Sequence, residues 1–108
     1  MGNELAAITE RINVLLDRLE RGDYGDQAKL EDTLTDGYAC ALSLDAECDR
    51  IERRLAEHAA ELTSESGDEH ARELSALARL LAHRRSELDS LRALLAHLRA
   101  GVQEARVA

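Results

Sequence analysis

Four side chains near the middle of the chain have the types and the spacing of a metal site. His58 and Glu61 are three residues apart, and so are His70 and Glu73, so each pair lies one turn apart on a helix. If the two segments run side by side, the two imidazoles and two carboxylates could hold a divalent ion such as zinc. The order is the reverse of the Glu-x-x-His order in di-iron bundles. The alternative is a solvated helix end, because such groupings are common in charged helices.

The same two histidines allow a second hypothesis, a response of this region to pH. Exposed imidazoles change charge near neutral pH, so His58 and His70 would alter the charge of the region together. His83 and His97 are fourteen residues apart and fall on the face away from the apolar positions. We interpret this second pair as solvated surface residues.

Catalytic patterns are weak in this sequence. Two aspartate pairs are spaced by one turn, Asp32 with Asp36 and Asp45 with Asp49, which is typical of an acid–base site only when the carboxyls are buried. On an exposed helix face they are simply solvated. The sequence has no phosphate-binding glycine loop, no Cys-x-x-Cys and no nucleophile elbow. We therefore expect a protein that is not an enzyme and uses no cofactor.

The composition favours an all-α fold. Hydrophobic residues make up 44% of the 108 residues, but two tyrosines are the only aromatic residues and proline is absent. The apolar residues are mostly Leu and Ala, which fit helices best, and no run alternates with the period of a strand. A chain of this length has room for one domain, residues 1–108.

The charge and the cysteines restrict the partners and the compartment. A net charge of -8 opposes binding to nucleic acids and to anionic membranes. No apolar run is long enough to span a bilayer, and the first residues lack the pattern of a signal peptide. Cys40 and Cys48 would lie about 12 Å apart on one helix, too far for a disulfide. We expect a soluble cytoplasmic protein with reduced thiols.

Three helices are predicted, and turn residues separate them. The apolar spacing places them at residues 3–21, 27–63 and 68–101, with a frayed tail at residues 103–108. The glycines of the cluster at residues 22–26 end the first helix, and Asp26 can cap the second. A short polar break at residues 63–68 then makes the second and third helices antiparallel.

The apolar positions of the two long helices can be matched along their whole length as an antiparallel coiled coil. In this register Leu55 faces Leu77, Cys48 faces Arg84 and Gly37 faces Leu95. The flanking residues Glu31, Tyr38 and Asp45 would lie opposite Arg99, Arg92 and Arg85. Because the first helix is short, it covers only one end of the hairpin. The expected architecture is a three-helix base with a projecting two-helix arm.

The arm should expose apolar side chains, because residues there have one partner helix where residues of the base have two. Exposed apolar patches of this kind usually mark an interface, and a two-fold dimer is the commonest arrangement that covers one. We therefore expect a non-enzymatic interaction or scaffold module that forms a homodimer, or binds another helical protein, through the arm. The alternative is a metal- or ligand-binding helical protein that uses the four residues at the arm tip. The expected interface consists of Ile51, Leu55, Leu74, Leu77, Leu80 and Leu81.

Overall fold

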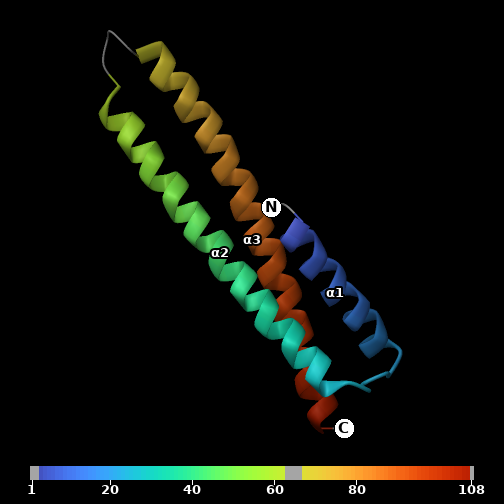
Figure 1. Cartoon of the computed structure of the whole chain (residues 1–108). Coiled ribbons are helices and arrows are strands. Elements are labelled where there is room, and N and C mark those ends of the chain that lie inside the picture. The colour runs from blue at the N-terminus through green and yellow to red at the C-terminus, as the bar shows by residue number, and fades with distance from the viewer. Residues whose placement is uncertain (1–2, 63–66, 108) are drawn as a thin grey trace. The chain divides into compact units, whose positions relative to one another are not determined.

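The computed structural model describes residues 3–62 and 67–107, and this part of the chain folds into three helices (Figure 1). They are α1 (Asn3–Glu20), α2 (Gln27–Ala60) and α3 (Gly67–Val107). The described ranges contain no strand, so the predicted all-α class is confirmed, with one short helix followed by two long ones.

The predicted signals at the junction of α1 and α2 have the expected geometry. Gly22 has a φ of 79°, and the Asp23 amide donates a 2.9 Å hydrogen bond to the carbonyl of Arg18. This is the glycine C-cap that satisfies the last carbonyls of a helix. Asp26 then caps α2, because its Oδ1 accepts a 3.0 Å hydrogen bond from the Lys29 amide.

Both ends of the hairpin differ from the expected boundaries. α2 ends at Ala60, whereas the expected end, residue 63, lies outside the described residues. The prediction of a frayed tail was wrong, since α3 continues to Val107. Val102 is only 3% exposed and Arg106 forms an ion pair with Glu31, so contacts with the other helices hold the last turns.

The described contacts divide the chain into two compact units. The three-helix unit comprises residues 1–42 and 89–108, and the two-helix unit comprises residues 43–88. In Figure 1, α1 lies beside the first part of α2 and the last part of α3. The remaining parts of α2 and α3 form the two-helix unit. This composition confirms the expected base of three helices and arm of two. The single domain expected from the sequence stays a prediction.

The three-helix unit is closely packed where helices meet at glycine. A Cβ added to Gly37 would lie 2.4 Å from Cδ2 of Leu95, so the predicted pairing of these residues in a close approach is confirmed. Arg11 of α1 also donates hydrogen bonds to Asp36 and to the buried Thr33 of α2. The core of this unit contains Ile8, Ile12, Leu15, Leu30, Cys40, Ala41, Leu91, Leu95, Leu98 and Val102.

The two-helix unit buries most of its large apolar side chains. Ile51 and Leu77 are each 4% exposed and Leu81 is 8% exposed, and they pack with Cys48 and the half-buried Leu55. The expectation that all six interface residues lack cover was therefore wrong for these three. The side chains of a two-helix hairpin include long polar ones, whose stems can cover apolar neighbours.

The ion pairs beside the apolar seam are shifted from the predicted ones. Arg85 pairs with Glu52, and Glu31 pairs with Arg106, where the register placed Arg99 opposite it. Long arginine side chains can reach carboxylates one to two turns from the position directly opposite, and exposed pairs of this kind add little to stability. Among the described residues, no helix is long and apolar enough to cross a membrane.

Candidate metal centre

The two-helix unit brings His58 and His70 together at the end of the hairpin. His58 lies in the last turn of α2 and His70 in the first turns of α3, on either side of the connection between the helices. Because the helices are antiparallel and both residues occupy seam positions, their rings meet where the apolar seam ends. The sequence led us to expect the two His–Glu sets near each other, with His58 facing Leu74 and His70 facing Leu62, whereas the structure places the two histidines against each other.

The geometry of this group is compact. Nδ1 of His58 lies 3.0 Å from Nδ1 of His70, and the ring centroids are 5.3 Å apart at an interplanar angle of 52°. Oε2 of Glu61 lies 3.9 Å from Nε2 of His70. One ligand atom from each of the three residues lies within 4.8 Å of the others. We call His58, Glu61 and His70 the tip cluster.

These spacings are close to those that a zinc ion imposes on its ligands. With bonds of about 2.0–2.1 Å in a tetrahedron, two zinc-bound atoms lie about 3.3 Å apart. The two Nδ1 atoms would open slightly from 3.0 Å to hold an ion between them. Glu61 lies nearer the other nitrogen of His70, Nε2, so its carboxylate would join that ion only after its side chain rotates towards the Nδ1 edge of the ring. Since the Glu61 side chain is 66% exposed, no packing prevents such rotations. The two imidazole nitrogens thus lie near the spacing of two zinc ligands, with the Glu61 carboxylate within reach as a third.

The fourth expected ligand, Glu73, is not part of this group. The group of at least three His, Cys, Asp or Glu ligands in the described ranges consists only of the tip cluster, and Glu73 is exposed on α3. It lies one turn beyond His70, farther from the end of α2. Three of the four ligands suggested by the sequence thus lie together in the structure, and Glu73 does not join them.

The two cysteines do not contribute to a metal site. Cys40 and Cys48 are both buried free thiols, 5% and 4% exposed. Burial raises the pKa of each thiol, for Cys40 with a smaller contribution from the carboxylate of Glu4. A thiol with a raised pKa stays protonated near neutral pH, and a protonated thiol is a poor ligand and nucleophile. Both side chains act as small core residues.

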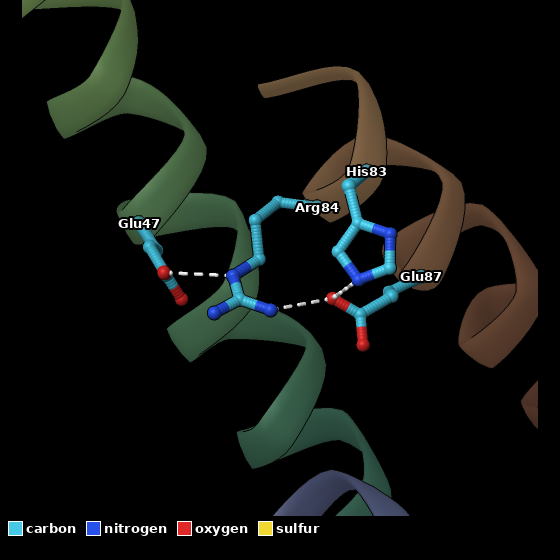
Figure 2. A network of polar contacts seen from close by, with 4 residues as sticks. All are labelled: Glu47, His83, Arg84 and Glu87. Atoms are coloured by element: carbon cyan, nitrogen blue, oxygen red, sulfur yellow. Dashed lines mark hydrogen bonds and ion pairs between the residues drawn. The ribbon is translucent and has the colours of Figure 1, made fainter. Parts of the chain in front are cut away.

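A polar network in the two-helix unit was not expected from the sequence (Figure 2). Arg84 interrupts the leucine seam, and its Nε donates to Glu47 at 2.9 Å while its Nη1 donates to Glu87 at 2.7 Å. These hydrogen bonds raise the pKa of the Arg84 guanidinium. His83 approaches the same carboxylate, with Nε2 at 3.5 Å from Oε1 of Glu87. The signal for this network was present, because glutamates lie three residues after Arg84 and one before its facing residue, Cys48.

Three hollows on the surface of the described ranges are open rather than enclosed. A groove of about 250 Å³ in the three-helix unit lies between α2 and α3, with Tyr38, Arg92 and Arg99 at its sides. Two hollows of the two-helix unit are each lined by residues of a single helix, 68–79 of α3 and 49–56 of α2. Small-molecule sites are usually enclosed cavities of about 300–1,000 Å³ with apolar walls. These surfaces offer a substrate little enclosure.

The expected interface residues divide into buried and accessible ones. Ile51, Leu77 and Leu81 are buried, Leu55 and Leu74 are half-buried, and Leu80 is 37% exposed.

The aspartate pairs, in contrast, remain near water as expected, and Asp36 is bound to Arg11.

Comparison with protein-family models, with curated proteins and with solved structures gives no match to this chain. Its function must therefore be inferred from its own residues.

Proposed function

We propose that this chain is a non-enzymatic helical protein that binds a divalent transition metal, zinc above all, at the tip cluster. The observation that carries the proposal is the placement of two imidazoles and a carboxylate, from two helices, within 4.8 Å of one another. Imidazole nitrogen and carboxylate oxygen are ligands that zinc takes readily, whereas magnesium and calcium prefer sites built of oxygen. The shallow hollows of the surface support a role in binding rather than in catalysis.

A metal would replace the contact that the histidines make without it. A hydrogen bond between the two Nδ1 atoms requires a proton on one of them. A metal between the rings requires both nitrogens as free lone pairs, so the ion takes the place of the shared proton. Because His58 belongs to α2 and His70 to α3, the ion would link the two helices at the end of the hairpin.

The proposal is tested by titrating the metal-free protein with zinc in a calorimeter and by thermal melts with and without zinc. We expect one ion per chain and a higher melting temperature, since a ligand at 100 times its Kd stabilises the folded state by about 2.7 kcal/mol. His58→Ala and His70→Ala should each weaken binding at least tenfold, because each removes one of three ligands.

A matched control is His97→Ala, which removes an exposed histidine of α3 from the three-helix unit. It should bind zinc like the original chain. If zinc leaves the melting temperature unchanged, or if His58→Ala and His97→Ala bind zinc equally, the tip cluster is not a metal site.

A second candidate function is an interaction module that associates through the two-helix unit. It is favoured by Leu62 and Leu80, which are 47% and 37% exposed in a unit that buries its other large apolar side chains more fully. Exposed leucines of this kind are typical of contact surfaces. A homodimer is the simplest arrangement that would cover them, and another helical protein is the alternative partner.

A further inference from the structure

We propose that the groove between α2 and α3 in the three-helix unit is a docking site for an acidic amphipathic helix of another protein. The groove has a volume of about 250 Å³, and Tyr38, Arg92 and Arg99 lie at its sides. It belongs to a different unit from the tip cluster, so the proposal is independent of the metal site. The docked helix would complete a four-helix arrangement around the pair α2 and α3.

The groove lies on the side of the three-helix unit that α1 does not cover. On α2, Arg11 of α1 bonds to Asp36, and Tyr38 follows two residues later, roughly 200° around the helix. On α3, a Cβ at Gly101 would meet a leucine of α1, and Arg99 precedes that glycine by two residues. Each long helix therefore has its contact with α1 and its groove residue on nearly opposite sides.

The shape of the groove suits a helix. Its floor includes Ala96 and Ala100, which are one turn apart on α3, and the buried Leu95 beside them. The lining residues of α3 span positions 92–103, about 16 Å along the helix axis, or about three turns of a partner helix. An amphipathic helix binds by laying its apolar face into a groove of this kind. A small molecule would gain less here, because it needs an enclosed cavity.

The charge of the groove selects an acidic partner. Within the described ranges, none of the seven residues that line it is acidic, although the whole chain has a net charge of -8. Arg92 and Arg99 are seven residues apart, so they share one side of α3, about two turns from each other. Glu31, which the register placed opposite Arg99, pairs with Arg106 instead. Two carboxylates seven residues apart on a docked helix would meet both groove arginines, and arginine binds carboxylates in a bidentate manner.

The net charge of the chain also determines how such a partner is recognised. A protein with a net charge of -8 repels an acidic chain on average. Only a partner that places its carboxylates beside the two arginines and its apolar side chains on the alanine floor gains enough to offset this repulsion. Recognition therefore depends on the arrangement of the partner's side chains along a helix, and acidity alone is insufficient.

The experiment measures binding of three fluorescent peptides to the full chain by anisotropy. Each has about 20 residues, long enough to form a helix in solution. The acidic peptide has leucine and alanine along one face and glutamates seven residues apart beside it. The basic peptide has lysine in place of those glutamates, and the scrambled peptide has the acidic composition without the apolar face. We expect saturable binding of the acidic peptide, and binding weaker by roughly tenfold for the other two.

Reversal of one charge in the groove tests the site directly. Arg99→Glu should weaken binding of the acidic peptide by roughly tenfold and strengthen binding of the basic peptide by a similar factor. The gain with the basic peptide requires a folded groove, so the test does not depend on a loss of binding alone. The matched control is Arg79→Glu, at an exposed position of α3 in the two-helix unit. It should leave the affinity for both peptides unchanged.

Each alternative occupant has its own outcome. If no peptide binds, or if the acidic and basic peptides bind equally, the groove is not a site for an acidic helix. If the scrambled peptide binds as well as the acidic one, the groove recognises negative charge alone and the helical partner is wrong. If light scattering without peptide gives a mass that Arg99→Glu lowers, a second copy of this chain occupies the groove and the inference is also wrong.

Discussion

Arg84 shows how a single polar residue can be accommodated in an apolar seam. Its side chain is 32% exposed, and its two glutamate partners, Glu47 and Glu87, have side chains 35% and 25% exposed. Charge-assisted hydrogen bonds between half-buried groups contribute more than pairs at the surface. The neighbouring Arg85, bound to Glu52, is the natural comparison, because its side chain is 55% exposed.

We predict that Arg84→Met lowers the free energy of unfolding by about 1–2 kcal/mol, the net value of the two charge-assisted bonds less the part screened by water. Arg85→Met should change it by less than about 0.5 kcal/mol, as is usual for exposed pairs. Urea denaturation at neutral pH measures both. Equal losses would mean that the half-buried network of Arg84 is worth no more than the exposed pair of Arg85. A gain from Arg84→Met would mean that apolar packing of the methionine outweighs the network.

At this scale the sequence was informative about the tip cluster and less so about the rest of the surface. The register placed His58 opposite Leu74, one turn from His70, and in the structure Nδ1 of His58 lies 3.0 Å from Nδ1 of His70. The partners of Arg84 and Arg85 did not follow from facing positions, because arginine reaches along the helix as well as across it. Which side chains bond on an exposed face depends on rotamers, and residue spacing does not determine these.

At the scale of the helices, a substitution of Gly37 in α2 should disturb the packing of α3 directly, because the two helices approach closely there. The added Cβ would meet Cδ2 of Leu95 at 2.4 Å, and Leu95 is only 1% exposed, so its side chain would have to shift within the core. Gly37→Ala gains about 1 kcal/mol of helix propensity. It also overpacks the core, which costs about 1–3 kcal/mol. We therefore predict a net loss of stability of roughly 1 kcal/mol.

A double-mutant cycle with Leu95→Ala isolates this contact. Leu95→Ala alone should cost about 2–5 kcal/mol through the cavity it creates. In the double variant the new methyl group occupies part of that cavity, so the loss should be smaller than the sum of the single losses. Additive losses in urea denaturation would show that Gly37 does not serve the close approach of α3.

Helix boundaries were predictable where the backbone itself sets them. Gly22 and Asp26 are local signals, and both have the expected geometry. The end of α3 was not predictable in this way, because Gly101 looks like a terminator in sequence. In the structure it lies inside α3, where a Cβ would come 2.7 Å from Leu19 of α1. A contact between distant segments, rather than a local preference, explains that glycine.

At the scale of the whole molecule, the exposed leucines of the two-helix unit lead to a prediction about self-association. We predict that light scattering gives the mass of two chains, and that Leu80→Asp shifts the mass towards one chain without unfolding the helices. Leu80 is suited to this test because it is 37% exposed, whereas Leu77 and Leu81 belong to the core. A charge placed on an apolar contact surface disfavours association because it must lose its water.

The matched control is Leu42→Asp, at a position that is 70% exposed in the three-helix unit. It should leave the mass unchanged. A single-chain mass for the original protein, or equal effects of both substitutions, would refute association through Leu80.

The division of the chain into two units also bears on the order in which it folds. The two-helix unit is one continuous segment, residues 43–88, whereas the three-helix unit joins residues 1–42 to residues 89–108. Contacts between near neighbours in sequence form faster than contacts that close long loops. Once the hairpin of residues 43–88 has formed, its first and last residues lie near each other. The loop that must close to bring Gly37 to Leu95 is then effectively shorter. We therefore expect the hairpin to act as the folding nucleus, with α1 joining last.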